Sequence, residues 1–238
     1  MSLKFFGIGS GFSPEHTSAY FLPDNKSLVL LDCSDTAFRK ICNDYKFDFR
    51  NLTKIYVLIT HTHGDHIGGL SLLVQHSYFI HKKKITVVAP SIEVANDLTT
   101  LLQIEGCNID WYDIITTSGI ENETWFGTYI PTNHVAQLDG KCFGYQLLVD
   151  SKIVVYTGDT ATLAPYEPFL VKGAELYVDT SFHKSDVHLN LEENLKNLLD
   201  IYTKGVTIYL MHIDDVDAIE KFLYDKKLFY FLDIAPVL

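Results

Sequence analysis

Basic residues are scarce in this chain of 238 residues. It has 19 lysines and arginines against 30 aspartates and glutamates, which gives a net charge of −11, and its only arginines are Arg39 and Arg50. Because binding along a nucleic acid needs Lys and Arg to neutralise phosphates, this balance argues against a surface for extended DNA or RNA. Any role with RNA would depend on a few local lysines or on a metal.

Paired cysteines and long apolar runs are also missing. The four cysteines, Cys33, Cys42, Cys107 and Cys142, form no CxxC pair, which argues against a zinc ribbon or a disulfide framework. The first residues lack the pattern of a signal peptide, and no apolar run approaches the roughly 20 residues of a membrane-spanning helix. We therefore expect a cytoplasmic protein with reduced thiols and no membrane partner.

No Pro-, Gly- or Ser-rich linker and no short repeat divides the chain. Apolar residues make up 47% and charged residues 21% of it, which is typical of a globular protein. A chain of this length can bury one large core. We predict a single domain over residues 1–238.

Short β-branched and aromatic runs alternate with segments of helical period. The predicted strands are residues 3–8, 19–22, 28–31, 54–59, 85–89, 125–130, 143–149, 153–156, 176–178 and 206–210. The predicted helices are residues 36–45, 66–77, 92–104, 191–202 and 216–224. The apolar segment 227–232 is interpreted as a last strand, with a homodimer contact as the alternative. This order favours an α/β protein with two packed sheets and outer helices.

The segment Thr60-His61-Thr62-His63-Gly64-Asp65-His66 follows the strand predicted at 54–59. So many polar side chains cannot fill a core, because each buried imidazole or carboxylate needs a partner. In an extended turn His61 and His63 can face one point, whereas Asp65 and His66, at the start of a helix, can face a second point. Imidazole and carboxylate groups are zinc ligands. The segment therefore predicts a metal site.

Further ligands must come from elsewhere in the chain. His134, Asp159 and His212 each come after an apolar run that is predicted as a strand. Loops at the edge of a sheet often collect functional groups. These three residues could supply the ligands that a two-metal site would otherwise lack.

The order His61-x-His63-x-Asp65-His66, then His134, Asp159 and His212, resembles the metallo-β-lactamase superfamily over the whole chain. The resemblance implies a four-layer αββα sandwich, in which two mixed β-sheets carry helices on their outer faces and two divalent metal ions lie at the sheet edge. It implies that Asp159 bridges the metals, and that the remaining ligands divide into His61, His63 and His134 for one metal and Asp65, His66 and His212 for the other. Zinc is expected, although manganese or iron would fit an oxygen-richer site nearly as well.

Other segments indicate a branch of this superfamily. Asp159 stands where the β-lactamases typically have a cysteine, so lactam hydrolysis is disfavoured. The start Phe5-Phe6-Gly7-Ile8-Gly9-Ser10-Gly11-Phe12-Ser13, the run Leu30-Leu31-Asp32-Cys33 and the pair Gly144-Tyr145 resemble the ribonuclease Z and phosphodiesterase branch. The glycine loop alone is weak, because without Gly-Lys-Ser/Thr it is no phosphate-binding P-loop.

The chain also departs from ribonuclease Z. The His-Glu-Ala-Thr motif is replaced by Val178-Asp179-Thr180-Ser181-Phe182, and a later His-Ser-Thr keeps only His188. The Ser-x-Arg expected after the last ligand reads Ile213-Asp214-Asp215, and no insertion corresponds to the arm that grips transfer RNA. These losses disfavour transfer-RNA processing and leave hydrolysis possible.

The leading hypothesis is a metal-dependent hydrolase, specifically a dinuclear-zinc phosphodiesterase for a small or cyclic phosphodiester or a short RNA end. A hydroxide bridging the metals would attack the phosphorus, Asp65 would orient this nucleophile, and His188, held by Asp179 or another carboxylate, would be the general acid. His183 is a competitor for that role. The metal charge would attract a small anionic substrate despite the acidic composition.

Two other functions remain open. One is a thioester or lactone hydrolase that resembles glyoxalase II, whose members usually lack the glycine-rich start. The other is a non-catalytic metal-binding module, against which the complete ligand set argues.

Overall fold

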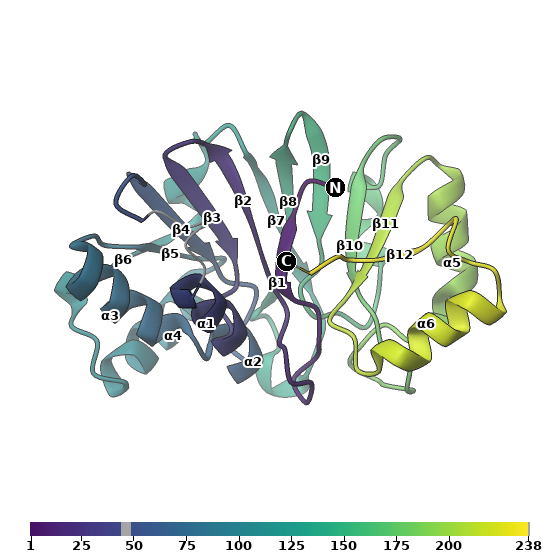
Figure 1. Cartoon of the computed structure of the whole chain (residues 1–238), viewed down its shortest axis with the longest axis horizontal. Coiled ribbons are helices and arrows are strands. Elements are labelled where there is room, and N and C mark those ends of the chain that lie inside the picture. Colours follow the sequence, from purple (N-terminus) through teal and green to yellow (C-terminus); the bar gives the residue numbers. More distant parts are fainter. Residues whose placement is uncertain (44–48, 238) are drawn as a thin grey trace.

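The computed structural model describes residues 1–43 and 49–237, and its core is a pair of six-stranded sheets. Figure 1 shows the two sheets side by side, with helices along the outer side of each. The first sheet contains β1 (Lys4–Gly7), β2 (Ser18–Asp24), β3 (Ser27–Leu31), β4 (Lys54–Leu58), β5 (Thr86–Ala89) and β6 (Asp113–Thr116), in that order. The second sheet contains β7 (Phe126–Thr132), β8 (Cys142–Val149), β9 (Lys152–Tyr156), β10 (Glu175–Asp179), β11 (Thr207–Met211) and β12 (Asp233–Ile234), also in chain order.

The two sheets repeat one pattern of strand directions. The first three strands of each sheet pair antiparallel, and the following strands pair parallel. Parallel neighbours need a crossover connection, which helices commonly provide. The helices are α1 (Asp35–Asn43), α2 (Gly64–Ile67), α3 (Leu70–His81), α4 (Ile92–Ile104), α5 (Leu191–Thr203) and α6 (Val216–Asp225), with short 3-10 turns η1 (Ile109–Trp111), η2 (Thr117–Ile120), η3 (Ala136–Leu138) and η4 (Ala164–Phe169).

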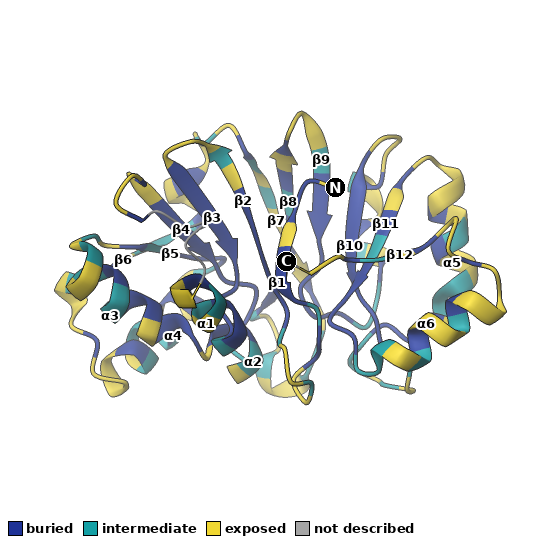
Figure 2. Ribbon diagram, in the orientation of Figure 1, coloured by how far each residue is buried: buried dark blue, intermediate teal, exposed yellow. Residues whose placement is uncertain are grey.

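Three apolar cores separate four layers. The central core lies between the sheets and includes Phe5 and Leu31 from the first sheet and Tyr156 from the second. The outer cores join α1, α3 and α4 to the first sheet and α5 and α6 to the second. Figure 2 shows mostly buried strands and helices whose outer faces are exposed. The predicted four-layer α/β sandwich with two mixed sheets and outer helices is confirmed.

Several predicted elements differ from the structure. The helix predicted at 66–77 is two helices, α2 and α3, separated at Gly68–Gly69, and β6 was not predicted. The helix predicted at 36–45 begins at Asp35 and is described as far as Asn43, so the end of that prediction lies outside the described residues.

The strand predicted at 227–232 is wrong. Lys227, two residues after the end of α6, has a left-handed backbone (φ 58°), and the next residues satisfy their backbone groups locally, as in the bond from Phe231 N to Leu228 O (2.8 Å). Only Leu228 and Leu232 of this segment are buried, whereas Tyr230 is exposed. The last strand is the short β12 that follows. A homodimer contact at this segment stays a prediction.

Within the described part of the chain, no helix combines the length and the apolar character that crossing a membrane requires.

Candidate metal centre

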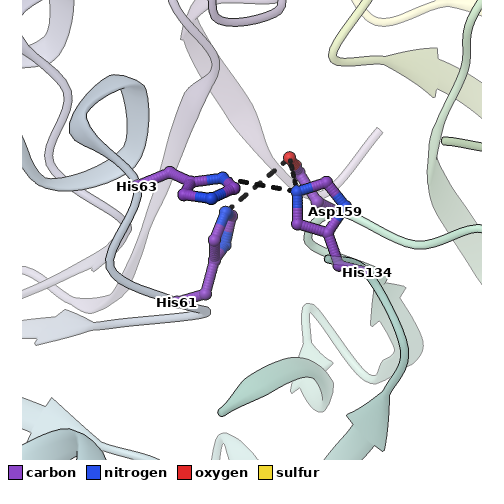
Figure 3. A group of neighbouring side chains, drawn as sticks. All are labelled: His61, His63, His134 and Asp159. Carbon is purple, nitrogen blue, oxygen red and sulfur yellow. Dashed lines mark hydrogen bonds and ion pairs between the residues drawn. The ribbon is translucent and has the colours of Figure 1, made fainter. Parts of the chain in front are cut away.

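The predicted ligands meet where strands of both sheets end. His61, His63, Asp65 and His66 follow β4, His134 follows β7, and Asp159 and His212 follow β9 and β11. Parallel strands that point the same way bring their carboxyl ends to one edge of a sheet, which is where α/β proteins place their sites. Figure 3 shows one group of these side chains facing a common point.

The first group consists of His61, His63, His134 and Asp159. One ligand atom from each lies within 4.8 Å of those of the others. Asp159 Oδ2 is 3.7 Å from His61 Nε2 and 3.5 Å from His134 Nε2. His134 Nε2 is 3.3 Å from His63 Nδ1. The structure therefore brings together the residues that the family resemblance assigns to one metal.

The second group consists of Asp65, His66, Asp159 and His212, whose ligand atoms also lie within 4.8 Å of one another. Asp159 Oδ1 is 3.1 Å from His66 Nε2 and 3.4 Å from His212 Nε2. His212 Nε2 is 3.2 Å from Asp65 Oδ2. The two oxygens of Asp159 thus face different groups, which is the arrangement expected of a bridging carboxylate.

The side chains at this centre fit divalent metal ions. His61 Nε2, His66 Nε2 and Asp159 Oδ1 are buried and form no hydrogen bond with any described residue. A buried polar atom without a partner costs about 1–3 kcal/mol, and a cation would supply the missing partner. The donor set of imidazole nitrogens and carboxylate oxygens suits zinc, manganese or iron.

The charges at the centre also favour a cation. Burial, together with the positive charge of His66, lowers the pKa of His61 and keeps this ring neutral, as a metal ligand must be. Burial raises the pKa of Asp159, but the positive charges of His212 and His66 lower it by more than burial raises it. The pKa of Asp159 is therefore well below its usual value. Burial lowers the pKa of His212, but Asp159, Asp179 and Asp65 raise it to about 10. Asp159 is therefore ionised and attracts positive charge.

Asp32 orients two of the histidines predicted as ligands. It is buried at the end of β3, where its Oδ1 accepts from Thr60 N (2.8 Å). Its Oδ2 accepts from Thr60 Oγ1 (2.8 Å) and from His66 Nδ1 (2.9 Å), which leaves His66 Nε2 for the centre. Thr60 Oγ1 is in turn 3.1 Å from His61 Nδ1. Such partners fix the tautomer and the orientation of a ligating histidine.

His188 lies beside both groups. Its Nδ1 donates to Asp179 Oδ2 (2.8 Å), and the other oxygen of Asp179 is 3.3 Å from His212 Nδ1. The His188 ring is 4.9 Å from the ring of His134 and 5.0 Å from that of His212. Burial lowers the pKa of His188, but its hydrogen bond to Asp179 raises it above the usual value.

His183, the competitor for the same role, is placed differently. Its side chain is 69% exposed, and its Nε2 is 3.8 Å from Asp215 Oδ2. Both histidines line one cavity of about 560 Å³, which is also lined by ligands from the two groups. Only His188 is held by a buried carboxylate at the centre.

Asp214 has a structural role that the sequence did not reveal. Its carboxylate accepts from Ser181 Oγ (2.7 Å), Phe182 N (2.7 Å) and His183 N (3.1 Å). It therefore fixes the loop that leads to His188. In the sequence Asp214 appears only as a departure from the Ser-x-Arg motif. An acidic residue two positions after a predicted ligand does not indicate that it accepts hydrogen bonds from a distant loop.

Solved structures share this fold. YhfI from Bacillus subtilis, a metallo-β-lactamase fold protein, matches with a TM-score of 0.75 and 17% identity over 98% of this chain and 95% of its own. Zn(2+)-bound PqqB from Methylobacterium extorquens matches with a TM-score of 0.73 and 13% identity over 100% and 98%. The short form of human tRNase Z, ELAC1, matches with a TM-score of 0.64 and 13% identity over 100% of this chain and 97% of its own. The chain thus has the metallo-β-lactamase fold.

Sequence comparison is more specific. The model of the family described as anti-Pycsar protein Apyc1 matches residues 1–231, and this chain belongs to that family. The anti-Pycsar protein Apyc1 of Bacillus phage 010DV004 is 26% identical over 242 residues, which cover 90% of both chains. A ribonuclease Z of Listeria welshimeri is 30% identical over 117 residues, but these cover only 47% of this chain and 37% of the relative.

Proposed function

We propose that this protein is a metal-dependent phosphodiesterase that hydrolyses a small phosphodiester, with a cyclic nucleotide as the first substrate to test. The observation that supports this most is the joint arrangement of two ligand groups sharing Asp159, with the His188–Asp179 pair beside them in one cavity. The four cysteines are free, which is compatible with action in the cytoplasm.

The ligand groups would hold two divalent metal ions, for which we propose zinc. His61, His63 and His134 would bind one ion, Asp65, His66 and His212 the other, and Asp159 both. The ions would supply Lewis acidity, which activates water near neutral pH and neutralises phosphate oxygens.

The side chains of the chain itself would move the protons. Asp179 holds His188 through Nδ1 (2.8 Å), which leaves Nε2 to give a proton to the leaving oxygen. Asp65, which is partly buried among the proposed ligands, would orient the attacking water and accept its proton. Asp214 would keep the loop of His188 in place through its bonds to residues 181–183.

The shape and the charge of the molecule favour a small substrate. The cavity of about 560 Å³ lies in the range of small-molecule sites, roughly 300–1,000 Å³. The net charge of −11 disfavours a long polyanion lying across the surface.

The relatives that match about nine-tenths of this chain are phage proteins named anti-Pycsar, and we propose that this chain also acts against Pycsar.

A turnover panel on the zinc-loaded protein tests the reaction class. The panel contains cyclic nucleotides, bis-p-nitrophenyl phosphate, S-lactoylglutathione, a lactone and a precursor transfer RNA. We expect hydrolysis of the first two classes. Turnover of the thioester or the lactone without any phosphodiester would contradict the proposal, and so would a preference for the transfer RNA.

The role of His188 has its own test. We expect His188→Ala to lower kcat on a cyclic nucleotide by about 100-fold or more, since a positioned general acid commonly contributes 10²–10⁴-fold, and to leave the metal content unchanged. The loss should be smaller on bis-p-nitrophenyl phosphate, whose leaving group needs less protonation. The matched control is His183→Ala, at an exposed histidine of the same loop. An equal loss on both substrates, or a loss of metal, would refute the role as general acid.

A further inference from the structure

Phe12 is an aromatic side chain that the fold leaves without a packing partner. Its relative exposure is 106%, the highest among the large apolar residues of the described chain, yet it lines the same cavity as His63, Asp65 and His188. Ordinary exposed apolar residues lie on outer surfaces, where they need no explanation. A fully exposed phenyl ring at the mouth of a charged cavity is a different case.

The backbone that carries Phe12 is a tight turn. Ser13 N donates to Ser10 O (2.9 Å), which places Gly11 and Phe12 at the two central positions. The base of the turn is closed by Gly9 N to Glu15 O (2.9 Å) and Thr17 N to Gly9 O (2.9 Å). A side chain on Gly9 would come within 2.4 Å of Ser13 Cβ, so the turn is compact.

This turn contacts both sides of the second ligand group. Ile213 O, next to the ligand His212, accepts from Ser10 N (3.0 Å) and from Ser13 Oγ (3.2 Å). A Cβ atom on Gly11 would lie 3.1 Å from Asp65 Oδ2. Phe12 therefore lies one residue away from the point where the backbone of the turn comes near Asp65.

We propose that Phe12 is the platform on which the base of a nucleotide stacks while the phosphate lies at the metal centre. This inference rests on the proposed function and adds the side chain that would hold the base of the substrate. Stacking on an aromatic side chain is favourable for every base, because each has a π-face. The other large groups of the cavity are imidazoles, three carboxylates and Lys184. The imidazoles, the lysine and metal ions held by the carboxylates suit the phosphate end of the substrate.

Binding can test this without turnover. Calorimetry on the zinc-loaded protein would compare cytidine 5′-monophosphate and adenosine 5′-monophosphate with ribose 5-phosphate, which lacks a base. We expect wild type to bind both nucleotides more tightly than the sugar phosphate. Phe12→Ala and Phe12→Leu should reduce this preference by about 5- to 100-fold, as expected for one stacked base, whereas Phe12→Trp should keep it. Ribose 5-phosphate should bind all four proteins alike.

The control is Ile104→Ala, which removes another solvent-exposed apolar group (78%) at the end of α4, outside the cavity. Equal affinity of wild type for the nucleotides and the sugar phosphate would overturn the inference. If Phe12→Ala lowered the affinity for all three ligands equally, Phe12 would instead hold the turn in place near Asp65. That result would also overturn the inference. So would a change in oligomeric state with the base preference intact, since Phe12 would then be an interface residue. Failure of the proposed hydrolysis would appear separately, in the turnover panel.

Discussion

Two buried residues of the centre have a left-handed backbone although neither is glycine. Asp32 has φ 61° and the predicted ligand His212 has φ 53°. For a residue with a Cβ this conformation costs roughly 1–2 kcal/mol, so surrounding contacts must hold it. At Asp32 these are the three hydrogen bonds from Thr60 and His66. The strain coincides with residues that position ligands, as is common at functional sites.

Asp32→Asn tests this positioning. Asparagine tolerates the left-handed region, but its amide cannot accept all three hydrogen bonds. We expect the affinity of the group formed by Asp65, His66, Asp159 and His212 for zinc to fall about 10- to 100-fold. The first group should change less, because Asp32 reaches His61 only through Thr60.

Competition with a chromophoric chelator measures both affinities. Asp150→Asn is the matched control, since Asp150 also has a left-handed backbone (φ 50°) but is exposed in the turn between β8 and β9. Unchanged zinc affinity in Asp32→Asn would show that His66 is oriented without Asp32.

Glu175 gives a pH dependence away from the metal centre. Its Oε1 accepts from Lys152 Nζ (2.8 Å), and its Oε2 accepts from Tyr177 (2.7 Å) and from Ser2 N (2.7 Å). Burial raises the pKa of Glu175, but these bonds lower it to about 2. A depressed carboxyl pKa stabilises the fold above the unfolded value of about 4.3 and loses this contribution as the pH falls toward 2.

We therefore expect Glu175→Gln to lower the free energy of unfolding by about 2–3 kcal/mol at pH 7. The difference from wild type should shrink steadily between pH 4.3 and pH 2. Urea unfolding at several pH values measures it, with Glu220→Gln on the exposed face of α6 as the control. A difference that is independent of pH would contradict the assignment of the shift to Glu175.

Among the elements, the boundary between α2 and α3 shows where sequence patterns stop being sufficient. The apolar spacing from His66 to Ser77 predicts one helix. The chain breaks it because Gly69 packs against the end of β3, where its N–H donates to Cys33 O (2.9 Å). That contact is between residues far apart in sequence, and no local pattern encodes it.

The other differences among the elements have similar causes. The strand β6 (Asp113–Thr116) has only Ile114 and Ile115 as apolar residues, both half-buried at the edge of the sheet. So short a run gives little periodic signal. The segment 227–232 is rich in apolar residues, as a strand would be. However, the left-handed backbone of Lys227 turns the chain and leaves Tyr230 in solvent. The strands that line the central core were predictable because their apolar runs are longer.

Gly69→Ala tests the helix break. The added methyl would lie 2.3 Å from Ser34 O, a backbone atom that cannot move freely. We expect a loss of about 2 kcal/mol or more in the free energy of unfolding, in the range of overpacking in a core. Gly64→Ala is the matched control in α2, because a methyl there meets no atom within 4 Å and should raise helix stability slightly. Equal effects of the two substitutions in urea unfolding would contradict this explanation.

At the scale of the whole molecule, the candidate centre was predictable in part. The cluster from His61 to His66 is local and stands out in the sequence. His134, Asp159 and His212 follow apolar strands, which made them candidate ligands, but only the family resemblance divided the candidates between two ions. The contacts of Asp32 and Asp214 depend on chain segments 28 to 34 residues away, so they became visible only in the folded chain.

Metal removal should weaken the whole fold, because the ligands come from both sheets. Without a cation, Asp65 and Asp159 lie close together with their pKa values lowered. A ligand that binds only the folded state stabilises it, by about 4 kcal/mol at 1,000 times its Kd. We expect zinc to raise Tm by several degrees and EDTA to reverse this. Scanning calorimetry measures it, and a Tm that does not respond to zinc in wild type would contradict the metal centre.

The repeated strand pattern divides the ligands evenly. Each sheet is a contiguous stretch of sequence, so the chain crosses from one to the other once, between β6 and β7. The first group takes His61 and His63 from one half and His134 and Asp159 from the other; the second takes Asp65 and His66, then Asp159 and His212. Neither half holds more than two of the predicted ligands of either group. Metal binding at either group would therefore require both halves of the chain to be docked against each other, and a measurement of metal affinity would detect a failure of that docking.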